Sequence, residues 1–312
     1  MARSLEESLS QPAVTTKRGS LPVSPYALLF VGVFSVALSS IFIKWSSAPA
    51  SIMGMYRLLF TIVLLLPFRP WKQTGAGRFS WSFKGSLLLV LSGLFLGLHF
   101  LFWMESLKHT SVASSMILLT LQPVFIMIGS FFLFKERTSV QGVVSLIVAL
   151  VGSVLIGWGD IGFSGQALYG DMLSIAGALS YSLYLMAGQK LMKEIPSMLY
   201  SLFVFIIAAL LLFVFNVFNH YTLTDYSPTD WGIFVLLALI PTVMGQMLFN
   251  WLLAYVNATT VSMAVIGEPV LAIILAYLLL NEQPTWLQAA GGLLTMLGVG
   301  IYFRIKPKSV QK

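Results

Sequence analysis

The chain has 312 residues, of which 58% are hydrophobic and only 9% are charged, and its formal net charge is +7. Soluble globular proteins carry about 25% charged residues, so this composition excludes a soluble protein and indicates a polytopic membrane protein. The absence of cysteine excludes a disulfide framework and thiol chemistry. Nucleic-acid binding is not expected, because surplus Lys and Arg in a membrane protein usually mark its cytoplasmic loops.

The first 24 residues are polar and of mixed charge. They lack the apolar core of a signal peptide, so we expect a disordered cytoplasmic tail rather than a cleaved leader. The first apolar segment after this tail then serves as the insertion signal.

Ten apolar segments follow, each close to the roughly 20 helical residues that cross a bilayer core. Their apolar runs are continuous and not alternating, which excludes a β-barrel and predicts an all-α bundle of ten transmembrane helices. Very short joints between some of them predict antiparallel neighbours. The expected spans are 25–45, 49–68, 85–107, 111–134, 139–158, 168–190, 197–219, 230–255, 259–280 and 285–304.

The basic residues predict the orientation of these spans. With the N-terminus in the cytoplasm, 15 of the 18 Lys and Arg residues fall in cytoplasmic segments, whereas Asp160, Asp171 and Glu282 fall outside. An even number of spans returns the C-terminal tail, residues 305–312, to the cytoplasm. We therefore expect a multi-pass protein of the plasma membrane with both termini inside.

One stretch of the chain is repeated in a modified form. The sequence LQPVFIMIGSFFLFKE, residues 121–136, reappears 146 residues later as GEPVLAIILAYLLLNE, residues 267–282. At this offset Pro123 maps onto Pro269, and each proline is followed 13 residues later by a glutamate. A duplication of five spans explains the offset.

Five is an odd number of crossings, so the second copy enters the membrane from the opposite side. We predict two inverted five-helix repeats, residues 25–158 and 168–304, around a central cavity. This architecture is common among secondary transporters because two inverted halves exchange roles between inward-open and outward-open states. We expect the paired glutamates, Glu136 and Glu282, to stabilise the joints at which they lie.

The order of short motifs points to a family. The first half reads SLKHTSVASS, a Gln-Pro pair, KERTSVQG and a Gly-rich span, and the second half reads AYVNATTVSM, Glu-Pro-Val, LLLNE and LQAAGG. From residue 25 onward the chain resembles the drug/metabolite transporter superfamily, specifically the EamA-type ten-helix transporters. The resemblance implies an inverted-repeat bundle with a central cavity and, typically, export of amino acids or other small metabolites, without fixing the substrate.

Glu268 lies near the middle of the ninth expected span, where an ionisable group needs an explanation. Pro269 beside it lacks a backbone N–H, so we expect a kink there and at Pro123. Glu268 either carries a coupling proton, meets a cationic group of the substrate, or caps the backbone freed by the kink. Its repeat mate Gln122 cannot titrate, which favours the structural alternative.

Arg57, in the second span, either snorkels outward or pairs with Glu105 or Glu268, and we favour a structural ion pair over a direct substrate role. His99 and Trp103 are four residues apart on the third span and share a helix face. The resemblance implies that the third and eighth spans line the cavity, so both are wall candidates.

Polar pairs mark two further helix faces. Gln246 and Asn250 lie four residues apart on the eighth span, after a third expected kink at Pro241, and Tyr181 and Tyr184 lie three apart on the sixth. An amide face is unfavourable in lipid, so these side chains should face the interior. They either form a pocket for a small zwitterion or an aromatic molecule, or they hydrogen-bond helix to helix.

The leading hypothesis is therefore a secondary transporter of a small organic metabolite, driven by protons or by the substrate gradient, with no cofactor or metal. A phosphate-binding loop of the type found in ATPases is missing from the sequence. An intramembrane enzyme is disfavoured, because the sequence has neither H-E-x-x-H nor G-x-S-x-G. A channel without a recognisable pore motif remains the other alternative, and the oligomeric state is left open.

Overall fold

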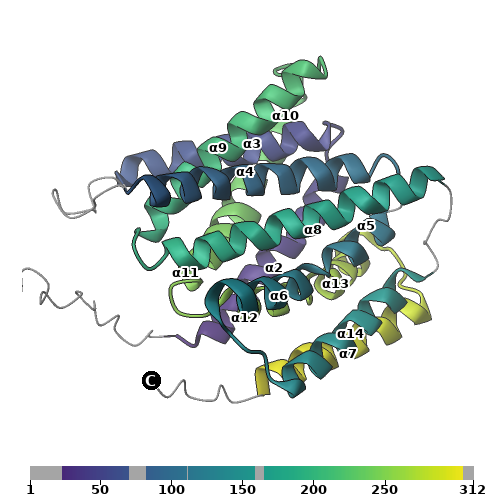
Figure 1. The fold of residues 1–312 in the computed structure, drawn as a ribbon. Helices are drawn as coiled ribbons and strands as arrows, with labels where there is room; N and C mark the ends of the chain where they lie inside the picture. The colour runs from purple at the N-terminus through teal and green to yellow at the C-terminus, as the bar shows by residue number, and fades with distance from the viewer. Residues whose placement is uncertain (1–22, 70–81, 111, 159–164, 305–312) are drawn as a thin grey trace, which may run out of the picture.

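The computed structural model describes residues 23–69, 82–110, 112–158 and 165–304. Nearly all of the N-terminal tail and the whole C-terminal tail lie outside these residues, as does Asp160. Within the described ranges the chain is helical and has no strand (Figure 1). The helices are α2 (Pro25–Lys44), α3 (Ala50–Leu65) with the short 3₁₀ turn η1 (Leu66–Phe68), α4 (Phe83–Ser106), α5 (Val112–Leu119), α6 (Gln122–Phe134), α7 (Val140–Ile156), α8 (Gly165–Leu191), α9 (Ser197–Phe218), α10 (Pro228–Leu237), the π-helical segment η4 (Ala238–Met247), α11 (Leu248–Leu252), α12 (Ala258–Val265), α13 (Glu268–Leu280) and α14 (Trp286–Arg304).

Eight continuous or bent helices in the described part of the chain are long and apolar enough to cross a membrane. Two of the ten expected spans fall outside this set. The helix α7 is apolar but has only 17 residues. The helix α8 has 27 residues, more than half of them buried, and carries many Ser, Tyr and Gln side chains. A helix surrounded by other helices does not need an apolar surface, because its polar groups find partners inside the bundle.

Two expected spans are each split into two helices by a proline. Pro123 and Pro269 occupy the second position of α6 and α13. A proline ring clashes with the carbonyl group four residues earlier. That residue is Leu119 or Val265, the last residue of the preceding helix in each case. The helical hydrogen-bond pattern is interrupted at residues 120–121 and 266–267, where turns join the two parts of each bent span.

The eighth span is interrupted in another way. Pro241 lies inside η4, a π-helical segment between α10 and α11. The Thr242 hydroxyl donates to the carbonyl of Leu237, five residues earlier, at 2.7 Å. A proline cannot donate the usual helical hydrogen bond, and π-helical turns are frequent at functional sites.

The sequence offset of 146 residues recurs in the helix bounds. Each bound of α12 and α13 lies 146 residues after the corresponding bound of α5 and α6. The helices α6 and α13 also end alike, because Lys135 and Asn281 both adopt left-handed backbone conformations, with φ of 58° and 55°. The two stretches that share sequence therefore share backbone geometry.

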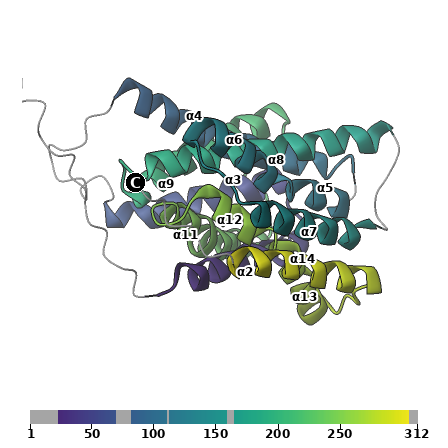
Figure 2. The same ribbon diagram turned by 60° about the horizontal axis from the view of Figure 1, so that its bottom comes forward.

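The helices α7 and α14 lie side by side at one edge of the bundle (Figure 1, Figure 2). A Cβ atom added to Gly298 would lie 2.5 Å from the nitrogen of Ala149 and 2.7 Å from the carbonyl oxygen of Ser145. One added to Gly291 would lie 2.8 Å from the nitrogen of Ile156. Higher numbers on α7 thus meet lower numbers on α14, so the two helices run antiparallel with their backbones in contact.

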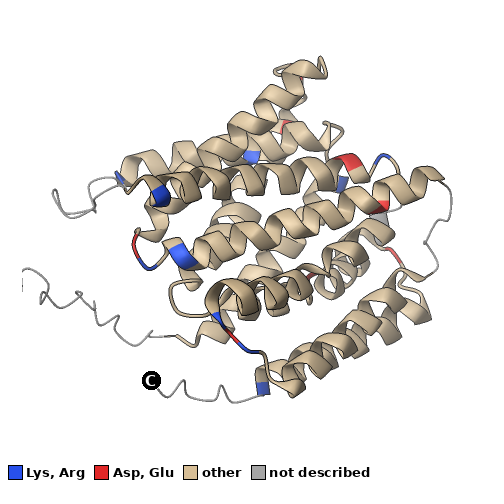
Figure 3. Cartoon of the chain, in the orientation of Figure 1, with Lys and Arg blue, Asp and Glu red and all other residues tan. Residues whose placement is uncertain are grey.

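The start of α2 and the end of α14 lie at the same end of the bundle. The ring of Tyr26 packs edge-on against that of Phe303 at a centroid distance of 5.3 Å. Figure 3 shows the basic segments concentrated at this end, on the left of the view, whereas acidic segments are more frequent at the right. The described bundle therefore has one predominantly basic end.

Candidate functional site: a central polar cavity

A cavity of about 80 Å³ lies where the broken helices meet. Side chains from α2, α3, α4, α8 and η4 line it together with residues at the breaks between α5 and α6 and between α12 and α13. Of the residues predicted from sequence, those that line the cavity are Arg57, His99, Trp103, Tyr181, Gln246, Glu268, Pro123 and Pro269. Residues on seven sequence-distant segments thus converge on one small space.

Arg57 is 6% exposed and therefore does not snorkel out of the bundle. Its Nε donates to the hydroxyl oxygen of Thr242 on η4 at 2.9 Å, and its guanidinium carbon lies 5.2 Å from the ring centroid of Phe100. The ion pair expected from the sequence is absent, because none of the ion pairs among the described residues includes Arg57. No carboxylate of the described residues forms an ion pair with it, although Glu268 is near enough to interact with its charge.

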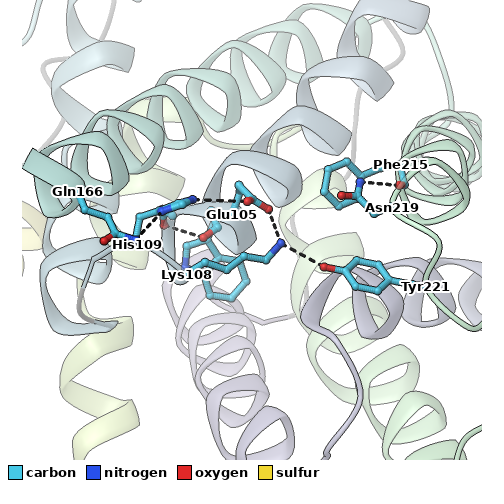
Figure 4. A network of polar contacts seen from close by, with 9 residues as sticks. Glu105, Lys108, His109, Gln166, Phe215, Asn219 and Tyr221 are labelled. Atoms are coloured by element: carbon cyan, nitrogen blue, oxygen red, sulfur yellow. Dashed lines mark hydrogen bonds and ion pairs between the residues drawn. The ribbon is translucent and has the colours of Figure 1, made fainter.

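Glu105, one of the two partners expected for Arg57, is engaged elsewhere (Figure 4). It accepts a hydrogen bond from Lys108 at 2.7 Å and lies 3.6 Å from Nε2 of His109. Lys108 also donates to the hydroxyl of Tyr221 at 3.1 Å. Burial lowers the pKa of Lys108, but its bonds to Glu105 and Tyr221 outweigh that effect and leave the pKa above its usual value. The end of α4 therefore carries a cluster of charged side chains that are bonded to one another.

Glu268 is the first residue of α13 and faces the cavity. Within the described residues its carboxyl group makes no hydrogen bond and no ion pair. The sequence-based alternative, in which Glu268 caps backbone groups freed at the kink, therefore finds no bond to support it. An intramembrane carboxyl group without a structural partner points to a substrate or ion role.

His99 and Trp103 form the α4 wall of the cavity. Nδ1 of His99 lies 3.0 Å from the carbonyl oxygen of Gly177. A carbonyl group only accepts, so Nδ1 carries the hydrogen and Nε2 is left as an acceptor. The ring of Trp103 is nearly parallel to that of His99, and its buried Nε1 has no hydrogen-bond partner. An orphaned buried donor beside a cavity indicates a place for an acceptor from a ligand.

The predicted Tyr and amide faces meet in one hydrogen-bonded chain. Tyr181 donates to Oε1 of Gln246 at 3.2 Å, and Nε2 of Gln246 donates to the hydroxyl of Tyr184 at 3.0 Å. Tyr184 donates to Oδ1 of Asn250, whose Nδ2 donates to Ser201 at 3.0 Å. Tyr181 and Gln246 line the cavity, whereas Tyr184 and Asn250 are fully buried behind it.

The two side chains that contact the Arg57 guanidinium were missed from the sequence. Phe100 packs against the Arg57 guanidinium, and Thr242 accepts from it. A signal for Thr242 was available: it lies four residues before Gln246 and follows Pro241, so it shares the amide face of the eighth span. No pattern in the sequence distinguishes Phe100 from the other phenylalanines of its span.

These features define a helical multi-pass membrane protein with a polar cavity at the centre of its bundle. The model of the EamA-like transporter family matches the sequence twice, over residues 23–158 and 168–304. The chain belongs to this family, in agreement with its resemblance to the drug/metabolite transporter superfamily.

Relatives of known name are transporters as well. An uncharacterized transporter of Archaeoglobus fulgidus is 24% identical over 250 residues, which cover 79% of this chain and 85% of that protein. The uncharacterized transporter YxxF of Bacillus subtilis is 24% identical over 294 residues, covering 93% of this chain and 92% of that protein. One crystal structure superimposes with a TM-score of 0.76 over 89% of this chain and 96% of the other, and its 16% identity makes this a likeness of fold alone.

Proposed function

We propose that this transporter exports a small organic metabolite, such as an amino acid, across the plasma membrane by alternating access. The observation that carries the proposal is that Arg57 and Glu268, one of each charge, line the same cavity without pairing with each other or with another ionisable side chain of the described residues. Ionisable groups in membrane interiors normally pair with one another or serve a substrate or ion pathway. A bound zwitterion satisfies both.

The hydrogen-bonding groups of the cavity fit such a substrate. The substrate carboxylate binds Arg57, which is suited to bidentate contact with carboxylates, and takes the orphaned Nε1 hydrogen of Trp103. The ammonium group binds Glu268 and the acceptor nitrogen of His99. Aromatic rings of Phe100 and Tyr181 supply an apolar wall for the rest of the molecule.

Alternating access rests on two inverted five-helix repeats, residues 25–158 and 168–304, with ten crossings in total. The antiparallel contact of α7 with α14 supports this arrangement, because these are the fifth helices of the two repeats. At 1.5 Å per residue, the 17 residues of α7 span about 26 Å. Local thinning of the bilayer accommodates so small a mismatch.

We assign the basic end of the bundle to the cytoplasm, with both termini on that side. The concentration of Lys and Arg at this end supports the assignment (Figure 3). Protons are the proposed coupling ion, with Glu268 as their carrier, because Glu268 is the unpartnered carboxyl group of the cavity and its mate Gln122 cannot titrate.

Exchange in proteoliposomes tests the proposal. Proteoliposomes that contain wild type, Glu268→Gln or the surface control Glu194→Gln are loaded with a panel of labelled amino acids and related zwitterions, with and without a pH gradient. We expect saturable exchange by wild type and the control, and gradient-driven accumulation that Glu268→Gln lacks. If Glu268→Gln accumulates substrate under the gradient as well as wild type does, Glu268 is not the proton carrier. Flux that rises linearly with concentration, without exchange, would replace the carrier with a channel.

A further inference from the structure

Glu136 and Glu282 are presented by the same backbone motif at the ends of α6 and α13. Each follows a residue in the left-handed conformation, Lys135 or Asn281. Each also donates its backbone N–H to the carbonyl group six residues earlier, that of Ser130 at 3.2 Å or of Ala276 at 3.3 Å. The motif fixes where each carboxylate can reach.

The carboxylate of Glu136 joins three segments of the bundle. One oxygen accepts from Nε2 of Gln189, in the last turn of α8, at 2.8 Å, and the other accepts from Nδ2 of Asn257 at 3.2 Å. Oε1 of Gln189 in turn accepts from the backbone nitrogen of Ala258, the first residue of α12, at 2.6 Å. Gln189 is 5% exposed and Ala258 is fully buried, whereas Glu136 and Asn257 are partly exposed, so this cluster is partly shielded from solvent.

Glu282 makes the corresponding contact with the other half of the chain. It accepts from Lys44, the last residue of α2, at 2.5 Å. The helices α2 and α8 are the first helices of the two repeats, so both glutamates reach the last turn of the first helix in the opposite repeat. The Lys44 and Glu282 side chains are each 52% exposed, unlike the cluster around Glu136.

The two contacts lie at opposite ends of the bundle. Glu136 precedes α7 and Glu282 precedes α14, and these two helices are antiparallel. Between the cavity and the Glu136 end the interior is filled: Tyr184 and Asn250, one turn beyond the cavity residues Tyr181 and Gln246, have no exposed surface. The cavity is therefore closed toward Glu136 in this conformation.

We infer that Glu136, Gln189 and Asn257 form a latch that holds the cavity shut at their end of the bundle, and that Lys44 and Glu282 form the repeat-related and weaker latch at the other end. This inference rests on the alternating access of the proposed function. Hydrogen bonds to a partly buried carboxylate contribute more than an exposed ion pair, which water and salt screen. The latches thus bias the resting protein toward opening at the Glu282 end.

Cysteine labelling tests the two latches directly. The chain has no cysteine, so Ser262→Cys places a single thiol at the cavity wall. Its reaction with a membrane-impermeant methanethiosulfonate is timed in vesicles of each orientation, without substrate. A separate Glu194→Cys variant, at an exposed position near the end of α8, identifies the vesicle face that carries the Glu136 end.

In the Ser262→Cys background, Glu136→Ala and Gln189→Met should each raise the labelling rate from the Glu136 face by roughly tenfold, because losing hydrogen bonds to a charged group shifts a two-state equilibrium by about that factor. Glu282→Ala should raise the labelling rate only from the opposite face, and Glu194→Ala should change the rate from neither face.

Gln189→Met keeps the side-chain length, so it replaces Glu136→Ala in the test if Glu136→Ala does not fold. Unchanged rates from the Glu136 face in a folded Glu136→Ala or Gln189→Met protein would overturn the latch. The rates need no substrate, so this result and a failed transport assay are separable.

Discussion

Gln122 and Glu268 hold the same position in the two halves of the chain: each is the first residue of a 13-residue half-helix, and both line the central cavity. The backbone is thus repeated, whereas the chemistry is not, since an amide stands where the other half has a carboxyl group. Of these two repeat-related positions in the cavity, only that of Glu268 carries a titratable side chain.

The substitutions Gln122→Glu and Glu268→Gln should have different effects on the stability of the protein. Gln122→Glu adds a second carboxyl group to the cavity, and we expect a loss of about 1–3 kcal/mol in stability, because Gln122 is 5% exposed and the new group loses its hydration there. Glu268→Gln removes an unpartnered carboxyl group and should leave stability unchanged or slightly higher. Thermal unfolding of both variants in detergent measures this. A stable Gln122→Glu protein would mean that the cavity is better hydrated than its size indicates.

Trp103→Phe should separate binding from stability. The change removes the orphaned Nε1 hydrogen and keeps most of the ring, so the empty protein should gain on the order of 1 kcal/mol. Substrate binding should weaken by about tenfold, because the ligand loses a donor in a site of low dielectric constant. Unfolding temperature with and without a saturating substrate gives both quantities. Leu101→Val, on the same helix, is the control. Weaker unfolding stability together with unaltered binding would contradict the role of Nε1.

Thr242→Val should disturb Arg57 without touching the cavity's charge. The variant keeps the shape of Thr242 but leaves the buried Nε of Arg57 without its acceptor, at a cost of about 1–3 kcal/mol in unfolding free energy. We expect weaker substrate binding as well, because the guanidinium is no longer oriented.

Thr61→Val is the matched control for Thr242→Val. Thr61 is a fully buried threonine whose hydroxyl bonds the backbone carbonyl of Arg57 and not its side chain. Equal effects of the two variants on binding would show that Thr242 acts through packing alone.

Gly298→Ala and Gly300→Ala form a pair of substitutions on one helix. The added methyl group at Gly298 would meet the α7 backbone at 2.5 Å, and backbone atoms cannot move aside as a flexible side chain does. We expect a loss of about 1–3 kcal/mol in stability. No atom lies within 4 Å of the added Cβ at Gly300, so that variant should be neutral. Thermal unfolding of the two variants measures this difference. Equal stabilities would contradict the close contact between Gly298 and α7.

The sequence predicted the helical class, most helix bounds and the family, because apolar runs of membrane length and a duplicated motif are strong local signals. It also pointed to residues on the correct faces: Arg57, His99, Trp103, Tyr181, Gln246 and Glu268 all reach the cavity. The sequence did not predict that these residues lie around one cavity, because their separation along the chain does not indicate their distance in space. The residue roles drawn from that convergence stay predictions.

Three details were beyond sequence reasoning, each for a physical reason. The ion pair expected for Arg57 is not formed: Thr242 and Phe100 contact its guanidinium instead, and Phe100 leaves no pattern in the sequence. The residues at which the helical pattern is interrupted before Pro123 and Pro269 were not predicted, because a proline sets where a helix is weakened and tertiary contacts set how far it bends. The π-helical segment η4 around Pro241 was not predicted, because a proline inside a helix marks a disturbance without specifying the hydrogen-bond pattern that replaces the usual one.

The close glycine contact between α7 and α14 has a consequence for how the protein is made. Gly152 is synthesised 146 residues before Gly298, so at about 5–20 residues per second α7 waits on the order of ten seconds for its partner. Until α14 emerges from the ribosome, the glycine face of α7 lies bare in the membrane. The final helix of the chain therefore decides whether the first half of the protein is ever fully assembled, and a shortened C-terminus should mark the nascent protein for degradation while its cavity residues are all in place.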